Sequence, residues 1–176
     1  MTAPQIYFMF KTIVRLLVLS LGVAGFARAA SGPMLPVEEQ VAEAIKSPKL
    51  TIVHFWAPWC SNCNAELNNP QGWASFIKTN PDVNFIFVTV WNETDGRPVL
   101  EKAGIHSPKN LTLLLHPNSS RKDDEKVRAF MGLDMPWLPT TWIFREGKIL
   151  YNIGYGEMRF PILQQFVTDA GNKWEH

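Results

Sequence analysis

The chain has 176 residues, of which 46% are hydrophobic and 19% charged, a size and composition typical of one globular domain with a sizeable core. Its formal net charge is +1, and it has no Lys/Arg-rich run, acidic tail or low-complexity tract, which argues against nucleic-acid binding and disorder. Cys60 and Cys63 are the only cysteines, too few for a disulfide framework or a four-thiolate zinc site.

Residues 1–30 have the order of a secretory signal peptide. Lys11 and Arg15 precede the apolar run 16–26, and residues 27–29 (Ala-Arg-Ala) have the small-x-small pattern of a signal-peptidase site. The run is shorter than the roughly 18 to 20 apolar residues that span a bilayer, although an uncleaved membrane anchor is the alternative.

A start at Met9 would make this signal more regular, because residues 6–10 are unusually apolar for its first part. We therefore expect residues 31–176 to form the folded domain and to be exported to a periplasm, with no stable membrane span after cleavage. An uncleaved signal would instead leave the domain anchored to the membrane. Because a periplasm is oxidising, paired thiols there form a disulfide unless they are kept reduced.

Predicted helices and strands alternate along the rest of the chain. Apolar residues at four-residue spacing predict a helix over 37–46, and apolar β-rich runs predict buried strands over 50–56, 83–91 and 111–115. Further helices are expected over 60–78 (interrupted at Pro70), over 98–103, from Asp123 to Gly132 and from Pro161; a hairpin is expected from strands 140–144 and 148–152. This order predicts an α/β layered fold with a mixed central sheet flanked by helices.

The informative stretch is 55–63 (Phe-Trp-Ala-Pro-Trp-Cys-Ser-Asn-Cys), where a predicted strand is followed by a helix. A cysteine at a helix N-terminus lies against the positive end of the helix dipole and unpaired N–H groups, which favour the nucleophilic thiolate. The two-residue spacer places Cys63 within one turn of Cys60, where it is able to resolve a mixed disulfide. A structural disulfide or an inert pair is the alternative.

This stretch resembles the active-site motif of the thioredoxin superfamily, and the resemblance extends from about Leu50 to Phe166. Glu66, three residues after Cys63, resembles the Trp-Cys-x-x-Cys-x-x-Glu pattern of TlpA/ResA-like exported thiol-disulfide oxidoreductases. Pro139 lies 76 positions after Cys63, farther than in simple thioredoxins. The resemblance therefore implies a thioredoxin-like three-layer fold with an inserted strand and helix between the Cys-x-x-Cys helix and the proline loop.

Residues 138–141 (Leu-Pro-Thr-Thr) resemble the family's cis-proline loop. The resemblance places Pro139 beside the cysteines, where the backbone of Leu138 would pair with an extended substrate segment. An ordinary trans proline at a strand entry is the alternative. Trp59 is either a substrate platform or a packing residue, whereas we expect three other tryptophans to be packing residues: Trp91, Trp137 and Trp142.

Two residues are candidates for handling the proton of Cys63. His54 stands where thioredoxins have a buried Asp, and is either a proton acceptor with a pKa lowered by burial or a core histidine bonded to backbone. Glu66 is the rival candidate, because its i,i+3 spacing from Cys63 places it on the same helix face. The Ser-Asn spacer between the cysteines has no proline and leaves the redox potential open.

The expected function is thiol–disulfide exchange, with Cys60 as nucleophile and Cys63 as resolving thiol and with no bound cofactor or metal. The resemblance implies a protein-disulfide reductase with exported client proteins and a membrane electron donor. A disulfide-donating oxidant is an alternative, and a copper-binding or metallochaperone module that uses the two thiols is another. Two methionines and two histidines suit copper but lack ligand spacing: Met131, Met135, His106 and His116.

Overall fold

The computed structural model describes residues 33–154 and 156–172, so the predicted signal peptide and the possible start at Met9 lie outside the described residues. Within this part of the chain, no helix has the length and apolar character needed to cross a membrane.

The core of the fold is a mixed five-stranded sheet with the order β3-β2-β1-β6-β7. Its strands are β1 (Thr51–Trp56), β2 (Asn84–Thr89), β3 (Leu111–Leu115), β6 (Thr140–Arg145) and β7 (Lys148–Ile153). Strands β1, β2 and β3 are mutually parallel, whereas β6 is antiparallel to β1 and to β7. The predicted mixed sheet and its closing hairpin are confirmed.

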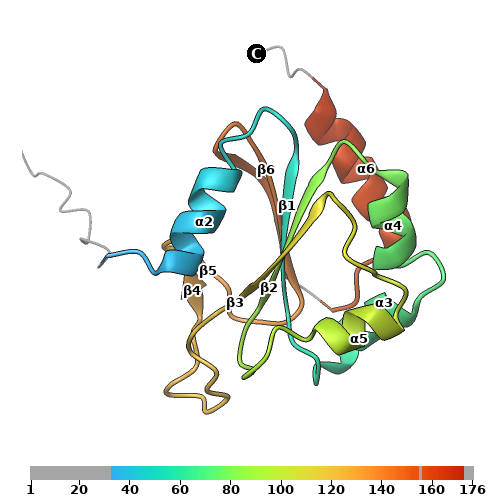
Figure 1. Cartoon of the computed structure of the whole chain (residues 1–176). Coiled ribbons are helices and arrows are strands. Elements are labelled where there is room, and N and C mark those ends of the chain that lie inside the picture. Colours follow the sequence, from blue (N-terminus) through green and yellow to red (C-terminus); the bar gives the residue numbers. More distant parts are fainter. Residues whose placement is uncertain (1–32, 155, 173–176) are drawn as a thin grey trace, which may run out of the picture. The chain divides into compact units, whose positions relative to one another are not determined.

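Helices cover both faces of the sheet (Figure 1). Helix α2 (Pro36–Ala44) packs on one face together with a small hairpin of β4 (Ala129–Phe130) and β5 (Leu133–Asp134). The other face carries α3 (Ser61–Asn68), α4 (Trp73–Thr79), α5 (Arg97–Lys102) and α6 (Phe160–Gly171). Because side chains alternate along a strand, Val53 and Phe55 face α2, whereas Ile52 and Trp56 face α3 and α4.

The helix expected over 60–78 is two helices, α3 and α4, as Pro70 indicated. The helix expected from Asp123 is wrong, because the chain there forms turns and then the β4–β5 hairpin. Met131 and Gly132 both have positive φ, the conformation of a two-residue hairpin turn, so this glycine belongs to a turn between two strands and does not end a helix. The strand over 111–115 is also partly exposed at the sheet edge rather than buried.

Gly96 and Gly132 offer a matched pair of positive-φ glycines, at +71° and +74°. A Cβ on Gly96 would lie 2.6 Å from the Trp56 ring and 2.8 Å from Pro58, whereas a Cβ on Gly132 meets nothing within 4 Å. We expect Gly132→Ala to lower the free energy of unfolding by about 1 kcal/mol, because a residue with a Cβ is strained at positive φ. Gly96→Ala should lower it by about 2–4 kcal/mol, because overpacking adds to that cost. Urea denaturation measures both, and equal losses would contradict the packing around Trp56.

Candidate active site

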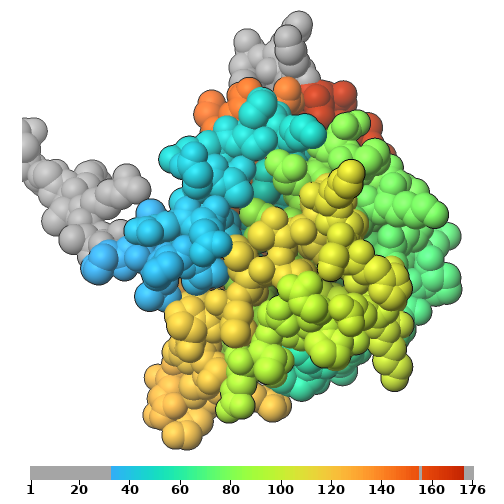
Figure 2. Space-filling model, in the orientation of Figure 1, coloured from blue at the N-terminus to red at the C-terminus, as the bar shows by residue number. Residues whose placement is uncertain are grey.

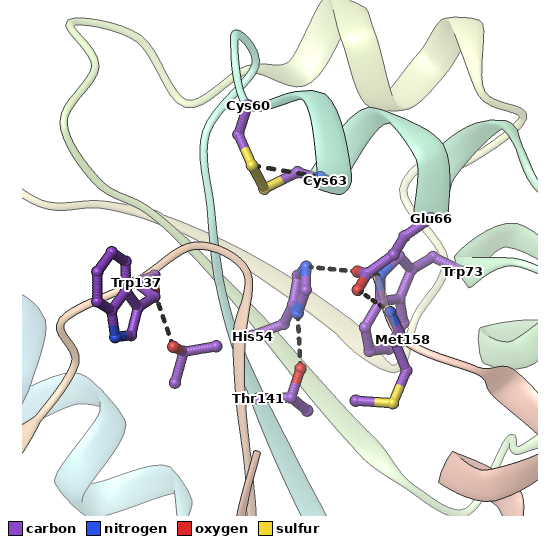
Figure 3. Close-up of polar contacts among 9 residues, drawn as sticks. His54, Cys60, Cys63, Glu66, Trp73, Trp137, Thr141 and Met158 are labelled. Carbon is purple, nitrogen blue, oxygen red and sulfur yellow. Dashed lines mark hydrogen bonds and ion pairs between the residues drawn. A yellow bond between two sulfur atoms is a disulfide. The ribbon is translucent and has the colours of Figure 1, made fainter. Parts of the chain in front are cut away.

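The two cysteines lie where buried strand β1 is followed by helix α3. Cys60 is the N-cap residue of α3, and its sulfur accepts the backbone N–H of Cys63 at 3.3 Å. The two sulfurs form a disulfide (Figure 3). Cys60 is 7% exposed and Cys63 only 1%. The helix N-terminus therefore presents Cys60 as the more accessible sulfur, with the dipole and an N–H group able to stabilise negative charge on it.

Sheet register brings the proline loop to the same place. Strand β6 is antiparallel to β1 and pairs Thr140 with Phe55, so the residues before β6 lie beside the end of β1. The peptide bond between Leu138 and Pro139 is cis, as the resemblance implied, and the alternative of a trans proline is wrong. Pro139 is buried and Leu138 half-buried. The backbone of Leu138 makes no hydrogen bond to another described residue.

Two tryptophans with exposed rings adjoin these segments in the chain. Trp59, next to Cys60, is 40% exposed, and its indole N–H donates to the carbonyl of Trp91 at 2.9 Å. Trp137, next to Leu138, is 66% exposed, so the expectation that it packs in the core is wrong, whereas Trp91 and Trp142 are buried as expected. Trp137 lies in the loop ahead of β6, outside the reach of either core cluster.

Glu66 lies in the interior, with an exposed fraction of 0%. Its Oε2 accepts the indole N–H of Trp73 at 2.8 Å, and its Oε1 accepts the backbone N–H of Met158 at 2.7 Å. No local sequence pattern indicates Trp73 or Met158 as partners, because Trp73 lies in α4 and Met158 in the segment before α6. These two hydrogen bonds satisfy a carboxyl group whose burial is otherwise costly.

His54 is also buried, and Figure 3 shows its imidazole beneath Cys63, between Thr141 and Glu66. Its Nδ1 lies 3.0 Å from the Oγ1 of Thr141, the residue paired with it across β1 and β6. Its Nε2 lies 3.5 Å from Oε2 of Glu66. The predicted burial is confirmed, whereas the backbone partner of the core-histidine alternative is not found, because both contacts are with side chains.

The pKa values of this pair move in opposite directions for the same reason. Burial among aromatic rings lowers the pKa of His54 from 6.5 to about 3, with the ring centroid of Trp73 4.4 Å away. Burial also raises the pKa of Glu66 from 4.5 to about 7, and the hydrogen bonds from Trp73 and Met158 only partly offset it. Between about pH 3 and 7, both groups are therefore predominantly neutral, and their contact is a polar contact rather than an ion pair.

The residues considered for copper differ in their surroundings. Met135 and His116 are buried, His106 is exposed and Met131 lies in the β4–β5 turn. Across residues 33–154 and 156–172, no three His, Cys, Asp or Glu side chains form a group able to hold a metal ion.

Comparisons with known proteins agree with this architecture. The family model of the thioredoxin-like domain matches residues 37–171. No curated protein matches the chain.

Solved structures share the fold at low sequence identity. A thiol-disulfide isomerase from Corynebacterium glutamicum is 17% identical with a TM-score of 0.51, over 75% of this chain and 86% of that one. A DsbF homologue from Corynebacterium diphtheriae is 16% identical with a TM-score of 0.51, over 72% of this chain and 74% of that one. A secreted Mycobacterium tuberculosis disulfide oxidoreductase homologous to E. coli DsbE is 21% identical with a TM-score of 0.49, over 72% and 85%.

His54 and Glu66 have opposite effects on how stability depends on pH. Because folding lowers the pKa of His54 from 6.5 to about 3, the folded state binds fewer protons in that window, and the free energy of unfolding rises with pH. Because folding raises the pKa of Glu66 from 4.5 to about 7, the folded state binds more protons in that window, and the free energy of unfolding falls as pH rises. The two effects oppose each other between pH 4.5 and 6.5.

Removing either group should expose the effect of the other. In Glu66→Gln, we expect the free energy of unfolding to rise between pH 4.5 and 6.5, with a slope of at most about 1.4 kcal/mol per pH unit for one proton. In His54→Gln, it should fall over the same window, and the unaltered protein should lie between the two. Urea denaturation of the disulfide form at several pH values measures this. Parallel curves for all three proteins would contradict the assigned pKa directions.

Proposed function

The chain belongs to the thioredoxin-like domain family, and on this premise we propose that it is a thiol-disulfide oxidoreductase that reduces disulfides of exported client proteins. The observation that carries the proposal is the Cys60–Cys63 pair at the start of α3, beside the cis-proline loop. The cysteine spacing and the helix terminus are the features that dithiol chemistry needs.

In the proposed reaction, Cys60 is the nucleophile. Its thiolate attacks one sulfur of a client disulfide, forms a mixed disulfide and releases the other client sulfur as a thiolate. Cys63 then attacks the sulfur of Cys60, which closes the protein disulfide and releases the second client thiolate. The client gains two electrons and two protons, and the protein dithiol loses them. The greater exposure of Cys60 and the N–H group of Cys63 aimed at its sulfur support this order.

Cys63 must lose its proton before it attacks, and we assign that step to the buried pair of Glu66 and His54. Glu66 lies one helical turn after Cys63, and the imidazole of His54 lies beneath the same sulfur in Figure 3. A carboxyl group with a pKa of about 7 is able to exchange a proton near neutral pH. His54 and Glu66 act here on Cys63 and not on the client.

The client segment is proposed to lie across the proline loop. The free backbone amide and carbonyl of Leu138 offer hydrogen bonds to an extended chain, as in the addition of a strand. The cis bond at Pro139 shapes this loop just before Thr140, which pairs with Phe55 of β1, and the exposed rings of Trp59 and Trp137 adjoin Cys60 and Leu138 in the chain. These features support binding of an extended polypeptide rather than a small molecule enclosed in a pocket.

The compartment and the electron supply are part of the proposal. The signal-like pattern of residues 1–30 supports export, and an exported reductase needs electrons from a membrane partner, since an oxidising compartment has no reducing thiol pool. The Trp-Cys-x-x-Cys-x-x-Glu pattern that ends at Glu66 supports a TlpA/ResA-like reductase with a narrow set of clients.

The two cysteines should behave differently when substituted. Cys60→Ser removes the attacking thiolate, so we expect reduction of a fluorescent peptide disulfide to fall at least 100-fold, to about the rate without protein. Cys63→Ser removes only the resolving thiol, so it should accumulate a mixed disulfide with the peptide, released by dithiothreitol. Stopped-flow fluorescence and mass spectrometry measure the two outcomes. Full turnover by Cys60→Ser would rule out the assigned nucleophile.

A further inference from the structure

The segment between β3 and β4 begins at the C-terminal end of β3, the same end of the parallel strands at which the cysteines follow β1. Strands β1, β2 and β3 are parallel, so the residues after β3 leave the sheet where α3 begins. Residues 116–128 form the light-orange lobe at the lower left of Figure 2, beside the yellow-green residues that follow β2. The lobe is therefore placed to contact whatever docks at Cys60.

Aromatic and cationic side chains attach this lobe to the residue next to Cys60. The guanidinium of Arg121 lies 4.0 Å from the ring centroid of Trp59, which stacks on Trp91 at 6.4 Å and 21°. The Nζ of Lys126 lies 5.1 Å from the ring centroid of Trp91, and the indole N–H of Trp91 donates to the carbonyl of Val127. The ring of Trp59 is fixed in turn by its own hydrogen bond to Trp91, so Arg121 rests on a preorganised surface.

Arg121 differs from the other cations of the lobe in having no acidic partner among the described residues. Three neighbours form ion pairs: Lys122 with Glu125, and Lys126 and Arg128 with Asp123. Arg121 is exposed, and its guanidinium lies over the face of Trp59. A guanidinium over an aromatic face still has N–H donors available, in the fork that matches a carboxylate.

We propose that Arg121 is a specificity-determining residue that selects client segments with an acidic side chain next to the cysteine under attack. The inference rests on the proposed function, since it concerns the client of the Cys60–Cys63 pair. Trp59 directly precedes Cys60. A carboxylate one or two residues from the client cysteine therefore reaches the guanidinium of Arg121 while the sulfur of that client cysteine meets Cys60. Asp and Glu are favoured there, neutral side chains are accepted more weakly, and Lys and Arg are disfavoured.

The test uses the reduced protein and three disulfide peptides that differ at one position beside a cysteine: Asp, Asn or Lys. In a single turnover, the Cys60–Cys63 dithiol is oxidised to the disulfide as each peptide is reduced to two thiols. We expect the second-order rate constant for the Asp peptide to exceed that for Asn about threefold and that for Lys about tenfold, the size of an exposed ion pair. Raising the salt to about 1 M should shrink these ratios, because the Debye length falls to about 3 Å.

Variants show whether Arg121 carries the preference. Arg121→Gln should bring the three rate constants together, and Arg121→Glu should favour the Lys peptide. The matched control is Lys109→Gln, which removes the same charge from an exposed residue before β3, at the opposite end of that strand. It should retain the preference for Asp.

Equal rates for the three peptides with the unaltered protein, or a preference that survives in Arg121→Gln, would overturn the inference while leaving the proposed function intact. If the reduced protein acts on none of the three peptides, the proposed function fails with it. If Lys109→Gln loses the preference for the Asp peptide as fully as Arg121→Gln does, the effect comes from net charge, which would also overturn the role of Arg121.

Discussion

The hydrogen bonds of the buried Glu66 carboxyl hold the site together. Both carboxyl oxygens are occupied, one by Trp73 of α4 and the other by the backbone of Met158 ahead of α6. Helix α3, the neighbouring helix α4 and the distant segment before α6 therefore meet at one side chain on the helix that begins at the cysteines. Because an unsatisfied buried carboxyl is costly, these segments stay in place around it. The same burial raises its pKa into the range where it is able to exchange a proton with a thiol.

The sheet supplies the second constraint. The parallel register of β1, β2 and β3 brings Cys60 and the Arg121 lobe to one edge, and the antiparallel register of β6 adds Pro139 and pairs Thr141 with His54. In the proposed reaction the client meets the more exposed Cys60, whereas the proposed proton-handling residues Glu66 and His54 lie in the core. Cys63, at 1% exposed, is less accessible to such a client than Cys60 at 7%.

Much of this arrangement is predictable from the sequence because it depends on local patterns. Continuous apolar runs identify the central strands, and a cysteine pair after such a run indicates the site. The turn at Gly132 was misread because a glycine after an apolar stretch suits both a helix end and a hairpin, and only the packing of Phe130 in the core decides between them. Contacts such as those of Trp73 and Arg121 depend on which loops meet in space, which no local pattern encodes.

The most direct test of the account is the reduction potential of the Cys60–Cys63 pair, measured by equilibrating the protein in dithiothreitol or glutathione buffers and counting free thiols by alkylation. A reductase predicts a potential near or below the roughly −270 mV of thioredoxin. A value towards the roughly −120 mV of a strong oxidant would contradict that direction and identify a disulfide donor. A pair that equilibrates with neither buffer would contradict thiol–disulfide exchange altogether.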